Sequence, residues 1–103
     1  MGAYFLSISD SLRGLGGRAQ RLRLLRNLTQ RDLATRAGVG LKALRRFEST
    51  GRGTLETAVR TAVALGVQDA FGALFEAPRF NSLAEAEAQA AVATRRRARR
   101  KRS

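Results

Sequence analysis

The segment from Thr29 to Phe47 constrains the fold most, because it has the pattern of two short helices held at a fixed angle. Thr29 is a good cap for the first helix, and Asp32 lies three residues later, at the position of the acid in a capping box. The apolar residues of this helix recur at three- and four-residue spacing, as a buried stripe requires. Gly38 supplies the left-handed conformation that ends a helix. We therefore expect a helix-turn-helix unit here.

The second helix of this unit has one apolar face and one basic face. Leu44 and Phe47 fall on the inner side of the expected helix. The outer side holds residues at spacing i, i+1, i+4 and i+5, namely Leu41, Lys42, Arg45 and Arg46. A basic outer face on the second of two such helices is typical of a DNA-binding helix-turn-helix.

Positive charge is concentrated in two parts of the chain. The 103 residues carry a formal net charge of +12. Residues 13–60 hold twelve basic groups against three acidic ones, residues 61–94 hold one against four, and residues 95–103 hold seven against none. Because the positive excess coincides with the helix-turn-helix and with the C-terminal tail, we expect a polyanionic partner. A merely solubilising role for this charge is the less favoured alternative.

Several functional classes are disfavoured by composition. The chain has no Cys and no His, so it has no disulfide framework, zinc finger, catalytic thiolate or imidazole base, and we expect no metal, no cofactor and no enzymatic activity. The glycines at 14, 16 and 17 follow no convincing strand, as a dinucleotide site would require. No apolar run approaches the roughly 20 residues that span a bilayer. We expect a bacterial cytoplasmic protein associated with the nucleoid, without a membrane partner.

Beyond these arguments, the sequence resembles the Cro and lambda-repressor-like (XRE-type) helix-turn-helix domain. The resemblance covers roughly residues 15–75. A narrower likeness, over residues 44–51 together with a short C-terminal domain and an Arg-rich tail, is to small HipB-type antitoxins and repressors. The motifs that carry the main resemblance are Thr29-Gln30-x-x-Leu33-Ala34-x-x-Ala37-Gly38-Val39, Phe47-Glu48 followed by Gly51, and Ala62-x-Ala64-Leu65-Gly66-Val67.

The resemblance implies an all-α fold with a five-helix DNA-binding domain, and it assigns roles to individual residues. Gln30 would hold a DNA phosphate and support the second motif helix, which we call the reading helix. Arg23 lies among apolar positions, so we expect it to be paired and partly buried, and the resemblance implies Glu48 as its partner. The residues that would face the major groove are Lys42, Arg46 and, less directly, Leu41 and Arg45. Gly40 departs from the usual Ser or Thr cap, and Leu41 is apolar at a base-facing position.

We divide the chain into an N-terminal arm (1–10), a helix-turn-helix domain (11–77), a C-terminal helical segment (78–94) and a disordered polybasic tail (95–103). Three glycines in the first domain helix predict a late or irregular start near residues 9–11. The fourth helix is expected over residues 55–67, and a short fifth helix over residues 68–75. Its aromatic side chains would lie in the core or in a dimer contact. The fourth helix is expected to turn inward Leu55, Val59, Ala62 or Val63, and Leu65.

The remaining candidate sites lie in a loop and at the C-terminus. Arg52, in the loop over residues 49–53, would contact a phosphate or be solvated. The tail would add phosphate contacts through Arg95, Arg96 and Arg97, although an acidic protein, an anionic lipid or solubilisation alone are alternatives. Ser82 and Glu85 predict a capping box for a marginal Ala-rich helix. The candidate contacts for a protein partner are Phe75, Phe80 and Leu83.

Two functions follow as hypotheses. The first is a sequence-specific transcriptional repressor that binds double-stranded DNA as a homodimer on a near-palindromic operator. The second is a HipB-type antitoxin that binds and neutralises a HipA-type Ser/Thr kinase toxin and represses its own operon. A nonspecific nucleic-acid binder that relies on charge alone is a weaker reading.

Overall fold

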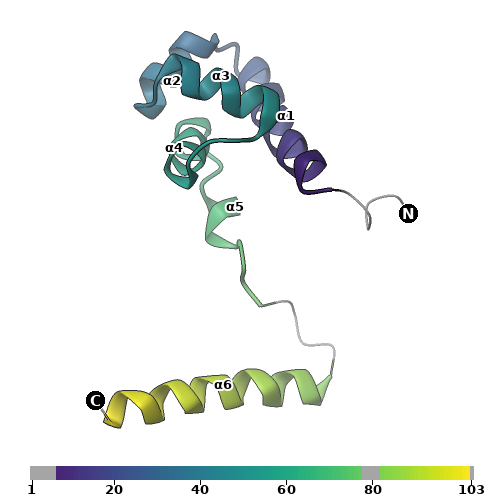
Figure 1. Ribbon diagram of the computed structural model, residues 1–103, viewed down its shortest axis with the longest axis vertical. Helices are drawn as coiled ribbons and strands as arrows, with labels where there is room; N and C mark the ends of the chain where they lie inside the picture. Colours follow the sequence, from purple (N-terminus) through teal and green to yellow (C-terminus); the bar gives the residue numbers. More distant parts are fainter. Residues whose placement is uncertain (1–6, 78–81, 103) are drawn as a thin grey trace.

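The computed structural model describes residues 7–77 and 82–102, and for residues 99–102 the backbone only. The expected arm before residue 7 and the candidate contact Phe80 therefore lie outside the described residues. The described part contains helices and no strand (Figure 1), which confirms the all-α prediction. The helices are α1 (Ile8–Leu25), α2 (Gln30–Ala37), α3 (Leu41–Thr50), α4 (Leu55–Leu65), α5 (Asp69–Gly72) and α6 (Leu83–Arg102). None of the helices in the described ranges is both long enough and apolar enough to cross a membrane.

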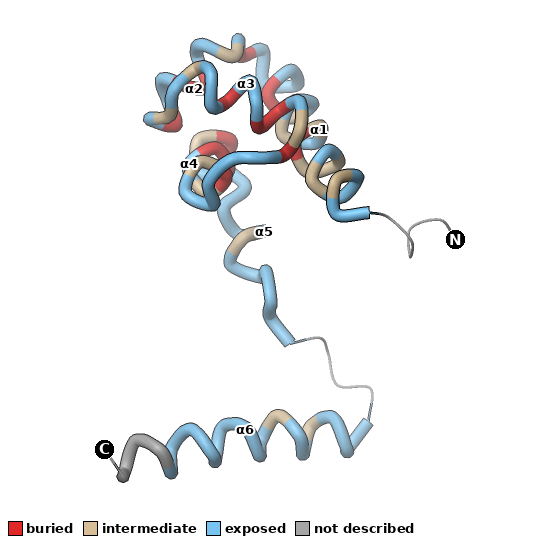
Figure 2. Tube along the Cα trace, in the orientation of Figure 1, coloured by how far each residue is buried: buried red, intermediate tan, exposed pale blue. Residues whose placement is uncertain are grey.

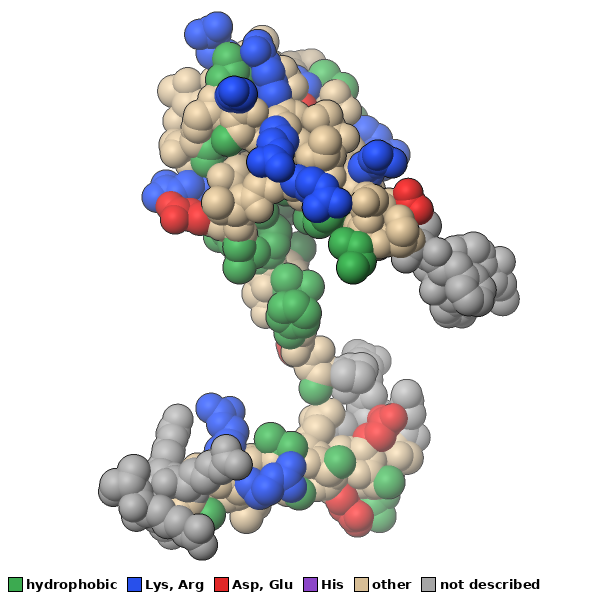
Figure 3. All heavy atoms as spheres, in the orientation of Figure 1, with side chains coloured by type: hydrophobic (Ala, Val, Ile, Leu, Met, Phe, Trp, Pro, Cys, Tyr) green, Lys and Arg blue, Asp and Glu red, His purple; other side chains and the backbone are tan. Residues whose placement is uncertain are grey.

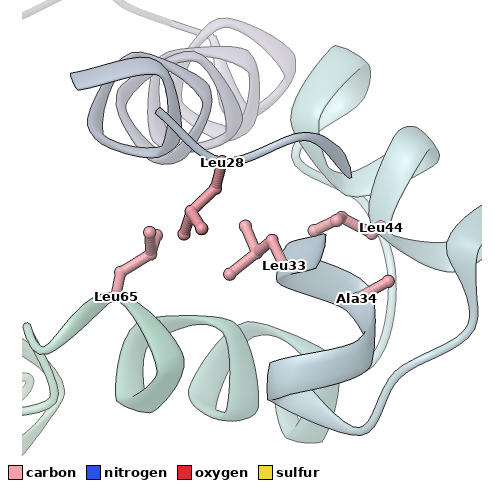
Figure 4. Close-up of a cluster of buried hydrophobic side chains, with 5 residues drawn as sticks. All are labelled: Leu28, Leu33, Ala34, Leu44 and Leu65. Carbon is pink, nitrogen blue, oxygen red and sulfur yellow. The ribbon is translucent and has the colours of Figure 1, made fainter. Parts of the chain in front are cut away.

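The core lies between the first four helices. Its central cluster takes one residue from the loop after α1, two from α2, one from α3 and one from α4 (Figure 4). Leu33 and Leu44 are fully buried. Because α2 and α3 meet through these side chains, their crossing angle depends on core packing rather than on the turn alone. The cluster consists of Leu28, Leu33, Ala34, Leu44 and Leu65.

The predicted capping of α2 is confirmed at both ends. The Thr29 hydroxyl accepts a hydrogen bond from the Asp32 amide at 3.0 Å, and the Asp32 carboxylate accepts one from the Thr29 amide at 3.1 Å. Gly38 ends the helix with φ of 69°, in the left-handed region. Both ends of α2, including the turn toward α3, are therefore specified by residues close together in the sequence.

The capping box makes the stability of the domain depend on pH through Asp32. The hydrogen bond from the Thr29 backbone, then the one with its side chain, hold the pKa of the Asp32 carboxyl below its ordinary 3.8, with the Arg36 charge adding a smaller effect. Because the folded pKa is the lower one, the stabilisation is present above the unfolded pKa and is lost as pH falls through the folded pKa. We expect Asp32→Asn to lower the free energy of unfolding at neutral pH, with the gap closing in acid. Urea unfolding at a series of pH values tests this, and a gap independent of pH would contradict it.

The expected late start of α1 is wrong. The helix runs regularly from Ile8, because the Ser7 hydroxyl caps it by accepting a hydrogen bond from the Asp10 amide at 3.0 Å. Gly16 has a packing role instead. A Cβ at this position would lie 2.2 Å from the Phe47 carbonyl oxygen, so α1 and α3 approach more closely than any side chain would allow. Gly17 faces open space and has no such contact.

The expected inner stripe of α4 is confirmed at Ala62 and Leu65 and wrong at Leu55, and the expected α5 is too long. Small residues of α4 face the core, and Leu55 and Val63 are 68% and 54% exposed. The small side chains allow α4 to pack closely on α2 and α1. The helix α5 has only four residues, after which Leu74 and Phe75 are 52% and 96% exposed, and Phe75 has φ of 65°. The buried residues of α4 are Ala58, Thr61, Ala62 and Leu65.

The basic tail is helical rather than disordered over the described residues. The helix α6 continues through the arginines to residue 102 and stands apart from α1–α4 (Figure 1). Ala and Arg are strong helix formers, and acidic groups near the start with basic groups at the end complement the helix dipole. Ser82 caps it by accepting a hydrogen bond from the Glu85 amide at 3.3 Å. Figure 2 shows that nearly the whole helix is exposed, and Leu83 is 74% exposed.

Candidate nucleic-acid interface

The outer face of α3 carries basic side chains, as the pattern predicts. Lys42, Arg45 and Arg46 are all exposed. On the face drawn in Figure 3, Lys and Arg side chains spread over the α1–α3 part of the domain, and apolar side chains gather over α4 and α5. Leu41, expected to face the groove, is half-buried and packs against the core cluster. It is therefore a poorer base contact than its neighbours.

Two exposed residues of α3 were missed by the sequence analysis. Ala43 and Ser49 are as exposed as the basic residues. Ser49 lies seven residues after Lys42 and three after Arg46, so the three share one side of the helix. The helical period alone predicts this position. The pattern of charges does not, because Ser49 is neutral. The Ser49 hydroxyl donates to the Arg46 carbonyl at 3.3 Å.

A buried ion pair fixes α3 to α1. The Arg23 Nε and Nη2 atoms donate to the two carboxylate oxygens of Glu48 at 2.7 and 3.0 Å, and its Nη1 donates to the Leu28 carbonyl at 2.8 Å. The two side chains are 8% and 2% exposed. This is a bidentate, fully hydrogen-bonded pair, the arrangement in which a buried charge is tolerated. It joins α1, the loop after α1 and the end of the reading helix.

Gln30 connects the same carboxylate to the exposed face of α3. Its Nε2 donates to the Glu48 Oε1 at 3.0 Å, and its Oε1 accepts from the Arg45 Nε at 3.3 Å. Gln30 is the first residue of α2 and is half-buried. The side chain that the resemblance assigns to a phosphate is therefore engaged with the reading helix in this structure.

The other candidate DNA contacts lie outside the motif helices α2 and α3. The Arg52 Nη2 donates to the Ser9 hydroxyl at 3.1 Å, which holds this loop residue against the start of α1. Gly51 makes that approach possible, since a Cβ there would overlap the Leu12 carbonyl. On α6, well separated from α3 (Figure 1), the exposed basic residues are Arg95, Arg96 and Arg97.

A cavity of about 170 Å³ opens between α1, α4 and α5, with apolar lining apart from Arg18 and Thr61. It holds no pair of titratable groups that could act as acid and base. Within the ranges 7–77 and 82–102, no cluster of carboxylates is arranged to hold a metal ion.

Comparison with known families agrees with this geometry. Residues 20–70, from the second half of α1 into α5, match the family model described as helix-turn-helix. The chain belongs to the helix-turn-helix family of the Cro and lambda-repressor type. As a member of this family it is a DNA-binding transcriptional regulator, and the family is a regulatory rather than an enzymatic one. No curated protein matches the chain.

Proposed function

We propose that this helix-turn-helix protein is a sequence-specific transcriptional repressor that binds a near-palindromic operator as a homodimer. The observation that carries the proposal is the reading helix α3, which presents Lys42 and Arg46 to solvent while Glu48, on its opposite side, is locked to α1. A helix held this rigidly can place donors in the major groove in a single register. Repression follows when the bound protein occupies promoter DNA, which we place in the bacterial cytoplasm, in the nucleoid.

The basic side chains divide into two roles in this proposal. Lys42 and Arg46 donate to guanine acceptors, and each good contact contributes about 1–3 kcal/mol of discrimination against a wrong base. Other side chains, all cationic except the neutral amide of Gln30, contact phosphates and supply affinity without sequence information. These positioning contacts are assigned to Gln30, Arg52, Arg95, Arg96 and Arg97.

An apolar surface on α4 and the segment after α5 supports the homodimer. Leu55 and Val63 lie eight residues apart on α4 and therefore on one side of it, and both are largely exposed. Leu74 and Phe75 add exposed apolar area after α5, where Figure 3 shows the apolar side chains gathered. An exposed patch of this kind marks a protein contact more often than a solvated surface. A homodimer on a near-palindromic operator must hold its two reading helices about 34–36 Å apart, one turn of DNA.

We expect Phe75→Asp to weaken the dimer at least tenfold, because the substitution places a carboxylate in an apolar contact. Sedimentation equilibrium of the full chain gives the dissociation constant directly. Leu83→Asp, at another largely exposed apolar position, on α6, is the control and should leave that constant unchanged. A Phe75→Asp protein that dimerises like the wild type would contradict this choice of surface.

The proposed function is tested by DNA binding. Fluorescence anisotropy at near-physiological salt compares the DNA upstream of the protein's own gene with a scrambled duplex of equal length. We expect a preference of about a thousandfold or more, the usual range for specific repressors. We expect Lys42→Ala and Arg46→Ala to reduce this preference about tenfold or more each, and Arg21→Ala, which removes an exposed charge of α1, to reduce affinity for both duplexes alike. Equal binding to duplexes of every sequence, including those drawn from a random library, would refute a sequence-specific repressor.

A second candidate is the HipB-type antitoxin that neutralises a HipA-type kinase toxin. It is favoured by α6, which stands apart from α1–α4 (Figure 1) and on which Leu83 and Val92 are 74% and 47% exposed. Such a helix gains stability when a partner covers it. Co-expression with the neighbouring gene product, followed by purification of the complex, tests this candidate. A protein that purifies free of any kinase would exclude it.

A further inference from the structure

Gln30 lies between a buried charge and an exposed one. Its Nε2 donates to the buried Glu48 carboxylate at 3.0 Å, and its Oε1 accepts from the exposed Arg45 guanidinium at 3.3 Å. Both partners belong to the reading helix, whereas Gln30 begins α2. The amide therefore bridges the core of the domain and its outer face.

The direction of this bridge is determined by chemistry. Both Glu48 carboxylate oxygens accept hydrogen bonds from Arg23, and Oε1 also accepts from Gln30, so Gln30 must turn its NH₂ group toward Glu48. The Gln30 oxygen then faces outward, where it requires a donor. Arg45 has only donors to offer, so the two side chains match in one orientation and not in the reverse. The two hydrogen bonds of Gln30 thus link the position of the Arg45 guanidinium to the Glu48 carboxylate.

We propose that Gln30 is a positioning residue that presets Arg45 for contact with DNA. Held at Nε, the guanidinium keeps both terminal NH₂ groups free for two acceptors, either guanine edge atoms or phosphate oxygens. A preset side chain loses less conformational entropy when it binds. The Arg46 guanidinium, one residue later, makes no hydrogen bond within the described part of the chain, so its position is not fixed in this way. The proposal rests on the DNA binding put forward above.

A double-mutant cycle tests the proposal on the full chain. The probes are the duplex that wild-type protein selects from a random library and a scrambled duplex of equal length. We expect Gln30→Met and Arg45→Ala each to weaken binding, and the effect of Arg45→Ala to shrink about threefold to tenfold in the Gln30→Met background. The same cycle between Gln30 and Arg46 is the control, and there we expect the two effects to multiply independently. If Gln30 acted only on the folding of the domain, its coupling with Arg45 and its coupling with Arg46 would be equal.

Two results would overturn the proposal. One is independence of Gln30 and Arg45, which would mean that Gln30 contacts DNA or the core without acting through Arg45. The other is tighter binding by Gln30→Met, which would mean that Gln30 sequesters the guanidinium from DNA. If the wild-type protein shows no sequence preference, the proposed repressor function is refuted, but the role of Gln30 is not. The coupling between Gln30 and Arg45 is then measured with the scrambled duplex.

Arg45→Lys provides a second test that does not disturb the core. Lys keeps the positive charge, but its donors are all on one terminal ammonium group. It therefore cannot donate to Gln30 through a separate Nε–H while a planar pair of NH₂ groups binds DNA. We expect Arg45→Lys to lose most of the affinity that Arg45→Ala loses, while Arg46→Lys loses less. An Arg45→Lys protein that binds like the wild type would overturn the proposal. Thermal unfolding of each variant verifies that the domain remains folded.

Discussion

Glu48→Ala is expected to destabilise the domain by about 3–5 kcal/mol, because it leaves the Arg23 guanidinium buried without its partner. The carboxylate also accepts from Gln30, so the substitution removes an end-of-helix contact of α3 with both α1 and α2. A small domain has a total stability of about 5–15 kcal/mol, so much of the population would unfold at physiological temperature. Urea unfolding followed by circular dichroism measures the change.

The chain contains a matched control for this prediction. Glu56 and Arg60 form an ion pair with the same 2.7 Å distance, but at the surface of α4, where the side chains are 72% and 51% exposed. We expect Glu56→Ala to cost only a few tenths of a kcal/mol, because an exposed pair is screened and gains little. Equal losses for Glu48→Ala and Glu56→Ala would show that burial of the first pair does not matter for stability.

Gly16→Ala and Gly17→Ala are expected to change stability in opposite directions. At Gly16 the new methyl group would overlap the Phe47 and Glu48 carbonyl oxygens, and backbone atoms of α3 can yield only by moving the helix, so we expect a loss of about 3 kcal/mol. At Gly17 nothing lies within 4 Å, and replacing a glycine inside a helix should add about 0.5–1 kcal/mol.

Thermal unfolding of the two adjacent variants checks this pair of expectations. The comparison is sharp because both substitutions add the same atom to the same helix, one residue apart. A Gly16→Ala protein as stable as the wild type would mean that α1 and α3 can separate without loss. In that case we would also expect a change at the base-contacting face, since α3 would have shifted relative to α1.

Local signals in the sequence predicted the helix-turn-helix well. The Thr29 and Asp32 box and the left-handed Gly38 are specified by residues within a few positions of each other, so no knowledge of the rest of the fold was needed. The stripe of α4 was misassigned for the opposite reason. Leu55 and Val63 fit a buried stripe by hydrophobicity, but the side of α4 that becomes buried is set by the assembled helices and carries Ala58, Ala62 and Leu65 instead.

The candidate site was likewise predictable where it depends on the local sequence, and not where it depends on contacts between helices. The exposed side of α3 follows from the helical period, and Ser49 could have been included on that basis. The bridge from Glu48 through Gln30 to Arg45 could not, because it depends on side-chain directions across two helices and joins residues that are 18 and 15 positions apart in the sequence. The start of α1 was misjudged because glycine lowers helix propensity on average, while Gly16 serves a close contact that the local sequence does not reveal.

The basic end of α6 has nearly the linear charge density of double-stranded DNA. Residues 95–102 carry seven cations in eight helical positions, which span about 12 Å at the α-helical rise of 1.5 Å per residue. That is one positive charge per roughly 1.7 Å, against one negative charge per roughly 1.7 Å of duplex axis. Self-repulsion should therefore loosen this helix end at low ionic strength, and either salt or a nearby duplex should tighten it. Salt that shields the helix would at the same time weaken its attraction to DNA, so order in this segment and its binding should respond to ionic strength in opposite directions.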